Sequence, residues 1–431
     1  MIIKRDYYLK KIIDKRENRR VKIITGIRRC GKSYLLFDLY KNYLLSEDIK
    51  EDQIISIALD EVENLEYRNP FKLNEYIKGK SQNPDQMHYV FIDEIQLCEA
   101  VCNPYVDSKE KSVTFVDVLL GLMKRKNLDI YVTGSNSRML STDVLTQFRD
   151  RGDEIHIGPL SFAEVYELYE NKQSAFEHYA LYGGMPYIYS LKNHEEKSQY
   201  LKQLFEETYI KDILERNNIQ NEREVLEVLL DFTSSAVGSL TNPTKLSRRF
   251  LSEKQIVISS NTISKYLSYF EEAYVLYHAN RYDVNGSRYF LTPLKYYFSD
   301  LGLRNARLNF RQVEDAHIME NIIYNDLLRR GYDIDVGGIE YDSKKDGDRK
   351  KTQLEVDFVI NQGHQRYYIQ SAFNINGTEK REQETASLKK INDSFKKIVV
   401  VGRNIIPRHD NDGILYVGIE EFLLNEGSID L

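Results

Sequence analysis

Cysteine and long apolar runs are both scarce in this sequence. The three cysteines, Cys30, Cys98 and Cys102, fit neither a disulfide framework nor a zinc site, because their number is odd and no second pair with metal-ligand spacing exists. No apolar stretch approaches the roughly 20 residues of a membrane-spanning helix. The N-terminus lacks the apolar core and the small-residue cleavage site of a signal peptide. We therefore expect a cytoplasmic protein without membrane contact.

Positive charge is not in excess either. The net charge is -6, so the chain as a whole does not attract nucleic acid, and any such binding must depend on a local basic patch. The length of 431 residues exceeds one ordinary core and predicts about two to four domains.

Short apolar runs alternate with helical patterns in the first part of the chain. Strands are predicted at 21–25, 54–59, 89–92 and 130–133, with a helix at 115–123 among the segments between them. This alternation is typical of an α/β fold with a mostly parallel sheet. After Phe162 the pattern becomes helical.

Residues 26–33 match the eight-position P-loop and lie between a predicted strand and a predicted helix. Gly26 and Gly31 let the backbone N–H groups face the phosphates, Lys32 reaches the β- and γ-phosphates, and the Ser33 hydroxyl binds Mg²⁺. We therefore predict ATP and Mg²⁺ as cofactors. The predicted nucleotide-binding residues are Gly26, Ile27, Arg28, Arg29, Cys30, Gly31, Lys32, Ser33 and Tyr34.

A second strand ends in the two carboxylates Asp93 and Glu94. Downstream of a P-loop, Asp93 is predicted to hold the Mg²⁺ shell and Glu94 to polarise the attacking water. Alone, such a strand end is more often a pair of solvated acids. The P-loop is what makes the catalytic interpretation preferable.

A third strand leads to Ser135 and Asn136, either of which is a candidate to sense the γ-phosphate. We choose Asn136, although a turn rich in small polar residues is an alternative explanation. Two arginines follow at Arg149 and Arg151, and Arg151 is our candidate to stabilise charge on the transferred phosphate. The alternative is a loop with solvated arginines.

Motifs along nearly the whole chain resemble a known family, the prokaryotic ATPases with an AAA_14-type N-terminal domain and a DUF4143 C-terminal region. The similar stretches are 24–29, 91–96, 133–135, 159–162, 183–186, 294–300 and 301–304. The resemblance implies an additional-strand ATPase core, a helical lid, a winged helix and a nuclease-like α/β end domain. We place these at residues 1–162, 163–220, 221–305 and 306–431.

The predicted winged helix is slightly basic, with eight Lys or Arg against five Asp or Glu between Thr241 and Asp300. A helix from Thr262 carries Lys265, and a ribbon with an Asn285-Gly286 turn carries Arg281 and Arg288. These cations are candidates for contacts with double-stranded DNA. Packing or protein contact is an equal alternative.

In the end domain, Glu320, Asp357 and Gln370 resemble the metal-binding positions of the PD-(D/E)XK nuclease fold. The third motif reads Gln370-Ser371-Ala372 instead of Glu-x-Lys, so one carboxylate and the lysine are missing. Strand alternation puts Glu355 on the face of Asp357, as a substitute ligand. We expect a nuclease fold that binds without cutting.

The leading hypothesis is an ATPase that hydrolyses ATP to ADP and phosphate and couples nucleotide state to a DNA- or partner-binding C-terminal half. One alternative is a nucleotide-gated binding module with little turnover. Another is an active ATP-dependent nuclease. A homo-oligomer or a protein partner is left open by the sequence.

Overall fold

The computed structural model describes residues 3–431 except 106–111, 135–150, 218, 220–221, 287, 312–313 and 346–347. The chain divides into two compact units: residues 1–158 with 272–274 form the first, and residues 159–271 with 275–431 form the second. We describe each unit by itself. In the described part of the chain, none of the helices has the length and apolar character needed to span a bilayer.

The first unit contains a parallel sheet with helices on both faces. Its elements are α1 (Asp6–Asp14), β1 (Val21–Thr25), η1 (Tyr34–Tyr40), α2 (Lys41–Ser46), η2 (Glu51–Gln53), β2 (Ile54–Ala58), η3 (Val62–Arg68), α3 (Pro70–Lys80), β3 (His88–Asp93), η4 (Ile95–Leu97), β4 (Val101–Cys102), β5 (Ser112–Val113), α4 (Phe115–Leu122), β6 (Leu128–Thr133) and β7 (Gly152–His156). The strand order is β2-β3-β6-β1-β7, with every pair parallel.

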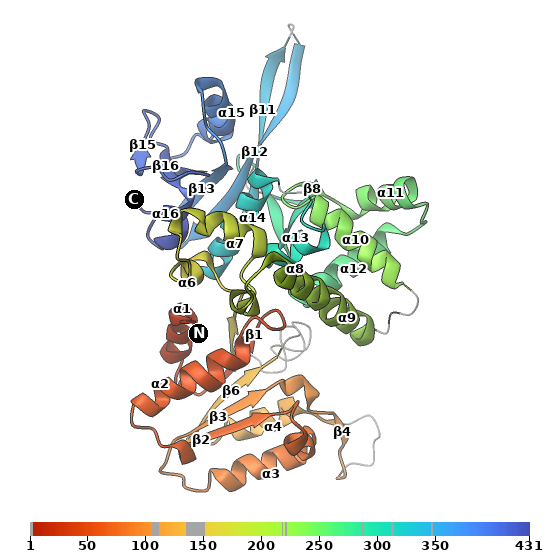
Figure 1. Ribbon diagram of the computed structural model, residues 1–431, viewed down its shortest axis with the longest axis vertical. Coiled ribbons are helices and arrows are strands. Elements are labelled where there is room, and N and C mark those ends of the chain that lie inside the picture. Colours follow the sequence, from red (N-terminus) through yellow and green to blue (C-terminus); the bar gives the residue numbers. More distant parts are fainter. Residues whose placement is uncertain are drawn as a thin grey trace. The chain divides into compact units, whose positions relative to one another are not determined.

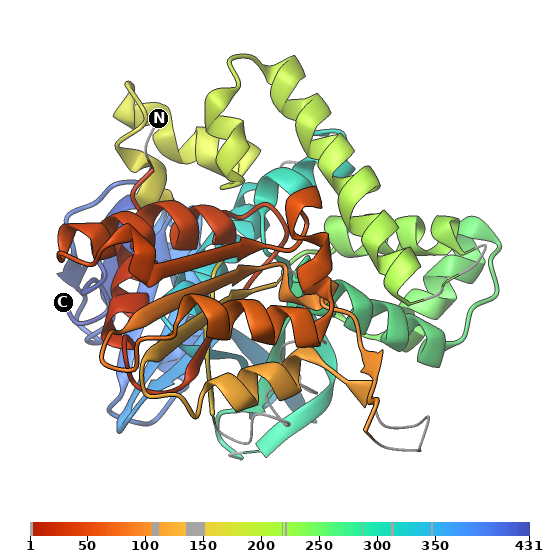
Figure 2. The same cartoon turned by 90° about the horizontal axis from the view of Figure 1, so that it is seen from below.

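This order confirms the predicted α/β class and the additional strand, because β6 lies between the P-loop strand β1 and the carboxylate strand β3. Alternating strand residues bury an aliphatic core with α3 and α4 on one face. On the other face, Tyr40 of η1 packs against Phe91 and Tyr131, with ring centroids 5.7 and 4.9 Å away. Figure 2 shows the red and the orange helices on opposite sides of the sheet.

The second unit begins with a helical segment and continues into a large mixed sheet. Its helices are α6 (Phe162–Tyr166), η6 (Lys172–Ser174), α7 (Ala175–Tyr182), η7 (Pro186–Ser190), α8 (His194–Gln203), η8 (Leu204–Ile210), α9 (Lys211–Arg216), α10 (Arg223–Ser235), α11 (Pro243–Lys254), α12 (Ser260–Glu272), α13 (Leu301–Arg307), α14 (Asp315–Arg329), α15 (Thr378–Lys389) and α16 (Ile419–Leu424). Its strands are β8 (Leu240–Thr241), β9 (Leu276–Asp283), β10 (Arg288–Phe298), β11 (Asp333–Lys345), β12 (Asp348–Gln362), β13 (Gln365–Ala372), β14 (Lys396–Val401), β15 (Arg408–His409) and β16 (Leu415–Gly418).

The ribbon β9–β10 belongs to the same sheet as the end-domain strands. The nine-stranded order is β15-β16-β14-β13-β12-β11-β9-β10-β8, and β9 pairs with β11 in parallel from Asn280 to Asp283. The sheet therefore crosses the boundary expected between residues 305 and 306. The pattern along the chain could not reveal this, because β9 and β11 are far apart in sequence.

The β11–β12 hairpin continues beyond its neighbours. Its pairing reaches Lys345 and Asp348, whereas β9 accompanies β11 only as far as Gly338. Figure 1 shows the pair extending past the rest of the sheet. The described residues of the charged segment 344–351 thus belong to the far end of this hairpin, as the Lys, Asp and Arg content of the segment predicts.

Two of the family motifs meet inside the second unit. The buried carboxylate of Asp300 accepts hydrogen bonds from the backbone N–H groups of Gly184, at 2.6 Å, and Leu303, at 2.9 Å. A Cβ at Gly183 would overlap this carboxylate, and one at Gly184 would overlap the carbonyl of Leu160. These glycines therefore allow the turn after α7 to pack closely against the start of α13.

Candidate functional site

The P-loop follows β1 with the backbone geometry that its glycines permit. Gly26 and Gly31 have φ values of 145° and 100°, in the region that side chains disfavour. A Cβ at Gly26 would overlap the carbonyl oxygen of Ile157. Ile27 and Cys30 are buried, while Arg28, Arg29 and Ser33 lie on the exposed side of the loop and Tyr34 is half-buried.

Lys32 is held against the loop itself. Its ammonium donates to the carbonyl oxygens of Gly26, at 3.0 Å, and Ile27, at 3.1 Å, and the residue is 5% exposed. The side chain is therefore already folded over the loop that would receive phosphate, where a full positive charge counts most.

The carboxylates at the end of β3 lie at the same sheet edge as the P-loop, because the strands are parallel. Asp93 is buried and accepts a hydrogen bond from Thr133, the last residue of β6, which in turn accepts from the backbone N–H of Glu94 at 3.2 Å. Glu94 has φ 51°, a left-handed conformation that costs a non-glycine residue about 1 kcal/mol or more. Its carboxylate accepts from the Gln96 amide.

Arg5 supports the P-loop from behind and was not predicted. It is 1% exposed and donates to the carbonyl oxygens of Cys30, at 2.8 Å, and Gly158, at 2.9 Å, while its guanidinium lies 4.6 Å from the Tyr8 ring centroid. Arg5 lies 25 positions before its loop partner Cys30, outside the P-loop motif. Only the folded chain reveals it.

The remaining residues predicted for the ATP site are the candidate γ-phosphate sensors and the two arginines. Ser135, Asn136 and Arg149 lie outside the described residues. Arg151 is exposed, and its carbonyl oxygen accepts from the N–H of Val21 at 3.1 Å. It therefore stands where β1 begins, about 13 Å of strand away from the P-loop. The role of Arg151 in stabilising charge on the transferred phosphate stays a prediction.

The end-domain residues gather around a lysine that sequence reasoning missed. The Lys295 ammonium, from β10, lies 2.8 Å from Glu320 Oε1, 2.8 Å from Glu355 Oε1 and 3.4 Å from Asp357 Oδ1. Glu355 thus shares the face of Asp357, as strand alternation predicts. The expectation that the cluster has no lysine is wrong, because β10 supplies one from outside the motif.

Gln370 faces Asp357 with its amide nitrogen, which donates to Asp357 Oδ2 at 2.7 Å. Gln370 therefore turns its amide nitrogen, and not its carbonyl oxygen, toward Asp357. Burial and the charge of Glu320 raise the pKa of Asp357 to about 7. Burial also disfavours the charged form of Glu320. Lys295, His317 and Tyr297 together have the larger effect, so the pKa of Glu320 is lowered.

The cations of the predicted winged helix divide into exposed and buried groups. Lys265 and Arg288 are exposed, as are Lys245 and Arg248 on α11. Arg281 is 7% exposed and lies over the Phe290 ring at 5.0 Å, so its expected contact with phosphate is not available. The sequence could not show this, because the burial of Arg281 depends on tertiary packing around the sheet.

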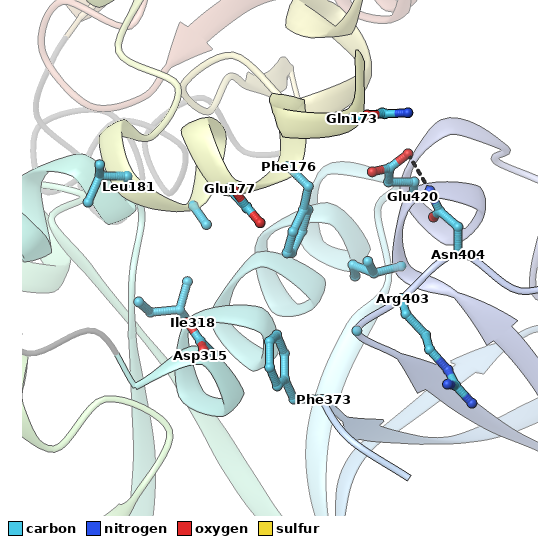
Figure 3. A pocket seen from close by; sticks show the side chains of 13 residues that line it. Gln173, Phe176, Glu177, Leu181, Asp315, Ile318, Phe373, Arg403, Asn404 and Glu420 are labelled. Atoms are coloured by element: carbon cyan, nitrogen blue, oxygen red, sulfur yellow. Dashed lines mark hydrogen bonds between the residues drawn. The ribbon is translucent and has the colours of Figure 1, made fainter. Parts of the chain in front are cut away.

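A separate cavity of about 490 Å³ lies in the second unit, between α7, the start of α14 and the turns after β13 and β14. Figure 3 shows Phe176 and Phe373 among its lining, together with the carboxylates Glu177 and Asp315. None of the residues predicted for ATP or metal lines it.

The parallel sheet with an inserted strand, the P-loop and the buried Asp93 at the same edge define an AAA-type P-loop ATPase domain. Family models agree: an AAA domain matches residues 18–166, and domains of unknown function, DUF8612 and DUF4143, match residues 173–314 and 316–422. An uncharacterized protein of Haemophilus influenzae is 32% identical over 98% of this chain and 99% of its own length. The chain therefore belongs to the family of AAA-domain ATPases with a C-terminal DUF4143 domain.

Other similarities are more distant. An uncharacterized protein of Methanocaldococcus jannaschii is 27% identical over 91% of this chain and 82% of its own length. Among solved structures, a Walker-type ATPase of Pyrococcus abyssi is 16% identical, with a TM-score of 0.47, over 71% of this chain and 96% of that one. The Aeropyrum pernix ORC1 protein in complex with DNA is 10% identical, with a TM-score of 0.28, over 74% and 94%.

Proposed function

We propose that the protein hydrolyses ATP to ADP and phosphate with Mg²⁺, and that its nucleotide state controls a DNA- or partner-binding C-terminal half. The observation that carries the proposal is the pair Asp93 and Glu94 at the sheet edge of the P-loop, with Glu94 in a strained backbone conformation. Such strain persists where the surrounding structure imposes it, and it is common at catalytic positions.

Each residue then has a defined role. Lys32 releases the loop carbonyls and binds the β- and γ-phosphates, while Ser33 and Asp93 hold Mg²⁺. Glu94 accepts the proton of the attacking water. The hydrogen bond from Gln96 involves one oxygen of the Glu94 carboxylate, and the other oxygen is the one that we propose takes the proton. Asn136 keeps its proposed role as the γ-phosphate sensor.

Arg151 acts on the nucleotide of a second copy of the chain. It directly precedes β7, so it lies at the end of the parallel sheet opposite to its own P-loop. A homo-oligomer is therefore the assembly in which this arginine has a catalytic role.

The order α10, β8, α11, α12, β9, β10, in which β8 pairs with β10, supports a winged helix. The exposed cations Lys245, Arg248 and Lys265 lie on its helices α11 and α12, and Arg288 lies on its ribbon. We propose that these residues contact the phosphates of double-stranded DNA. A protein partner is the alternative, since each of these cations is also compatible with an acidic protein surface.

The test is the rate of ATP hydrolysis with and without double-stranded DNA, for the wild type and Glu94→Gln. We expect turnover that DNA changes and that Glu94→Gln abolishes. Turnover that Glu94→Gln leaves intact contradicts the assigned base. Binding of ATP with negligible turnover favours the nucleotide-gated module instead.

A further inference from the structure

The carboxylate cluster of the end domain, formed by Glu320, Glu355 and Asp357, already contains a cation that belongs to the chain. We propose that Lys295 is the resident cation of this cluster and that it keeps the end domain free of divalent metal. The proposal depends on neither ATP nor DNA.

The first argument is the position of the ammonium. Its nitrogen is 2.8, 2.8 and 3.4 Å from one oxygen of each carboxylate, so the three oxygens surround a single point. The ammonium donates hydrogen bonds to Glu320 and Asp357 and forms an ion pair with Glu355. A divalent metal would need the same oxygens at about 2.0–2.6 Å from the same point. Lysine and metal therefore compete for one place.

Burial favours the lysine over the metal in this competition. The Lys295 side chain is 4% exposed, and those of Glu320 and Asp357 are 8% and 10% exposed. An ammonium that left the cluster would have to find other partners inside the protein, because a buried unpaired charge costs several kcal/mol. Burial works against its charge, but the three carboxylates outweigh burial and raise the pKa of Lys295, so it stays charged.

Asp357 and Glu320 also have other polar groups of the chain near their oxygens. Asp357 Oδ2 accepts from the Gln370 amide at 2.7 Å and from the Ser371 backbone N–H at 2.9 Å. Glu320 Oε1 also accepts from the Tyr297 hydroxyl at 2.7 Å, and Glu320 Oε2 lies 3.7 Å from His317 Nδ1. These oxygens are therefore hydrogen-bonded or close to a polar group of the chain before any ion arrives.

Lys295 also offsets part of the carboxylate charge without a metal, because its ammonium lies close to all three carboxylates. In the described residues, no group of three or more His, Cys, Asp or Glu has the arrangement of a metal site.

The ion pairs of the cluster also connect the three elements β10, α14 and β12. Lys295 comes from β10, Glu320 from α14, and Glu355 and Asp357 from β12. The ribbon of the proposed winged helix is thereby fixed to the end domain by an internal ion pair network.

The first experiment compares Mn²⁺ binding by the full-length wild type and Asp357→Asn, without nucleotide, at concentrations up to about 1 mM, the weak end of protein sites. Electron paramagnetic resonance measures the free Mn²⁺. We expect both proteins to bind the same number of ions. One additional ion bound by the wild type would overturn the proposal, because the cluster would then be a metal site despite Lys295.

The second experiment removes the ammonium with Lys295→Met, which keeps most of the length of the side chain. We expect this variant to bind one more Mn²⁺ than the wild type, at least about tenfold more tightly than any Asp357-dependent binding by the wild type. The double variant Lys295→Met with Asp357→Asn should lose that ion, and Lys254→Met, on the surface, should not gain it. A folded Lys295→Met protein without the additional ion contradicts the proposal. If that variant does not fold, the first comparison decides alone.

Discussion

Replacing Arg5 with methionine should weaken both the ATPase unit and its affinity for ATP. The side chain is buried and donates to the carbonyl oxygens of Cys30 and Gly158, which lie in the P-loop and just after β7. Methionine fills much of the volume but donates no hydrogen bond. Both carbonyls therefore lose a charged donor, and the loop loses the contact that fixes its position.

The magnitude follows from these contacts. A hydrogen bond to a charged group contributes about 1.5–3 kcal/mol, so two contribute about 3–6 kcal/mol. The contact with the Tyr8 ring adds about 1 kcal/mol to the expected loss. The variant no longer buries a charged guanidinium, and this gain reduces the loss. We therefore expect a loss of about 3 kcal/mol in the free energy of unfolding of the ATPase unit. A less ordered loop should raise the dissociation constant of ATP by about tenfold or more.

Urea unfolding followed by tyrosine fluorescence measures the first effect, and titration with ATP at a temperature where the variant is folded measures the second. Arg19→Met is the matched control, because Arg19 is exposed. Unchanged stability together with unchanged affinity would refute the role of Arg5. Reduced stability with wild-type affinity would show that Arg5 stabilises the fold without positioning the loop.

The remaining predictions concern the nucleotide site, DNA and cleavage. Lys32→Ala should remove most ATP binding, because Lys32 is the loop residue placed to set a full positive charge on the β- and γ-phosphates; calorimetric titration with wild-type affinity would contradict this. Glu94→Gln should bind ATP but release no phosphate, since the amide keeps the size of the carboxylate and accepts no proton; phosphate release at the wild-type rate would exclude Glu94 as the base. DNA binding should weaken steeply with salt and disappear when the exposed cations are replaced together by glutamine, whereas the same change of Lys389, Lys396 and Lys397 should leave it intact; fluorescence anisotropy measures this for Lys245, Arg248, Lys265 and Arg288. Finally, the protein should not cut single- or double-stranded DNA with Mg²⁺ or Mn²⁺, with or without ATP, and gel electrophoresis that detects cuts lost in Asp357→Ala would show a live nuclease.

The P-loop and the strand that ends in carboxylates were predictable because the residues of each motif follow one another in the sequence. Gly26 to Ser33 carry the P-loop motif in eight consecutive residues, and a strand that ends in Asp93 and Glu94 carries its own hydrophobic pattern. Parallel pairing then brings the two strand ends together at one edge. For the same reason, the strands β1, β3 and β6 were predicted to within a residue or two at each end.

Tertiary structure decided which distant side chains join these motifs. Arg5 reaches the carbonyl of Gly158, 153 positions away, and Lys295 reaches Asp357, 62 positions away. Neither pair has a fixed spacing that a pattern can contain. The sequence alone therefore determined the AAA-domain class, and the P-loop that it contains predicts the nucleotide-binding residues. Folding decided that Arg281 is buried, that Arg151 lies away from its own P-loop, and that β10 brings a lysine to the end-domain carboxylates, because each depends on strand pairing between segments remote in the chain.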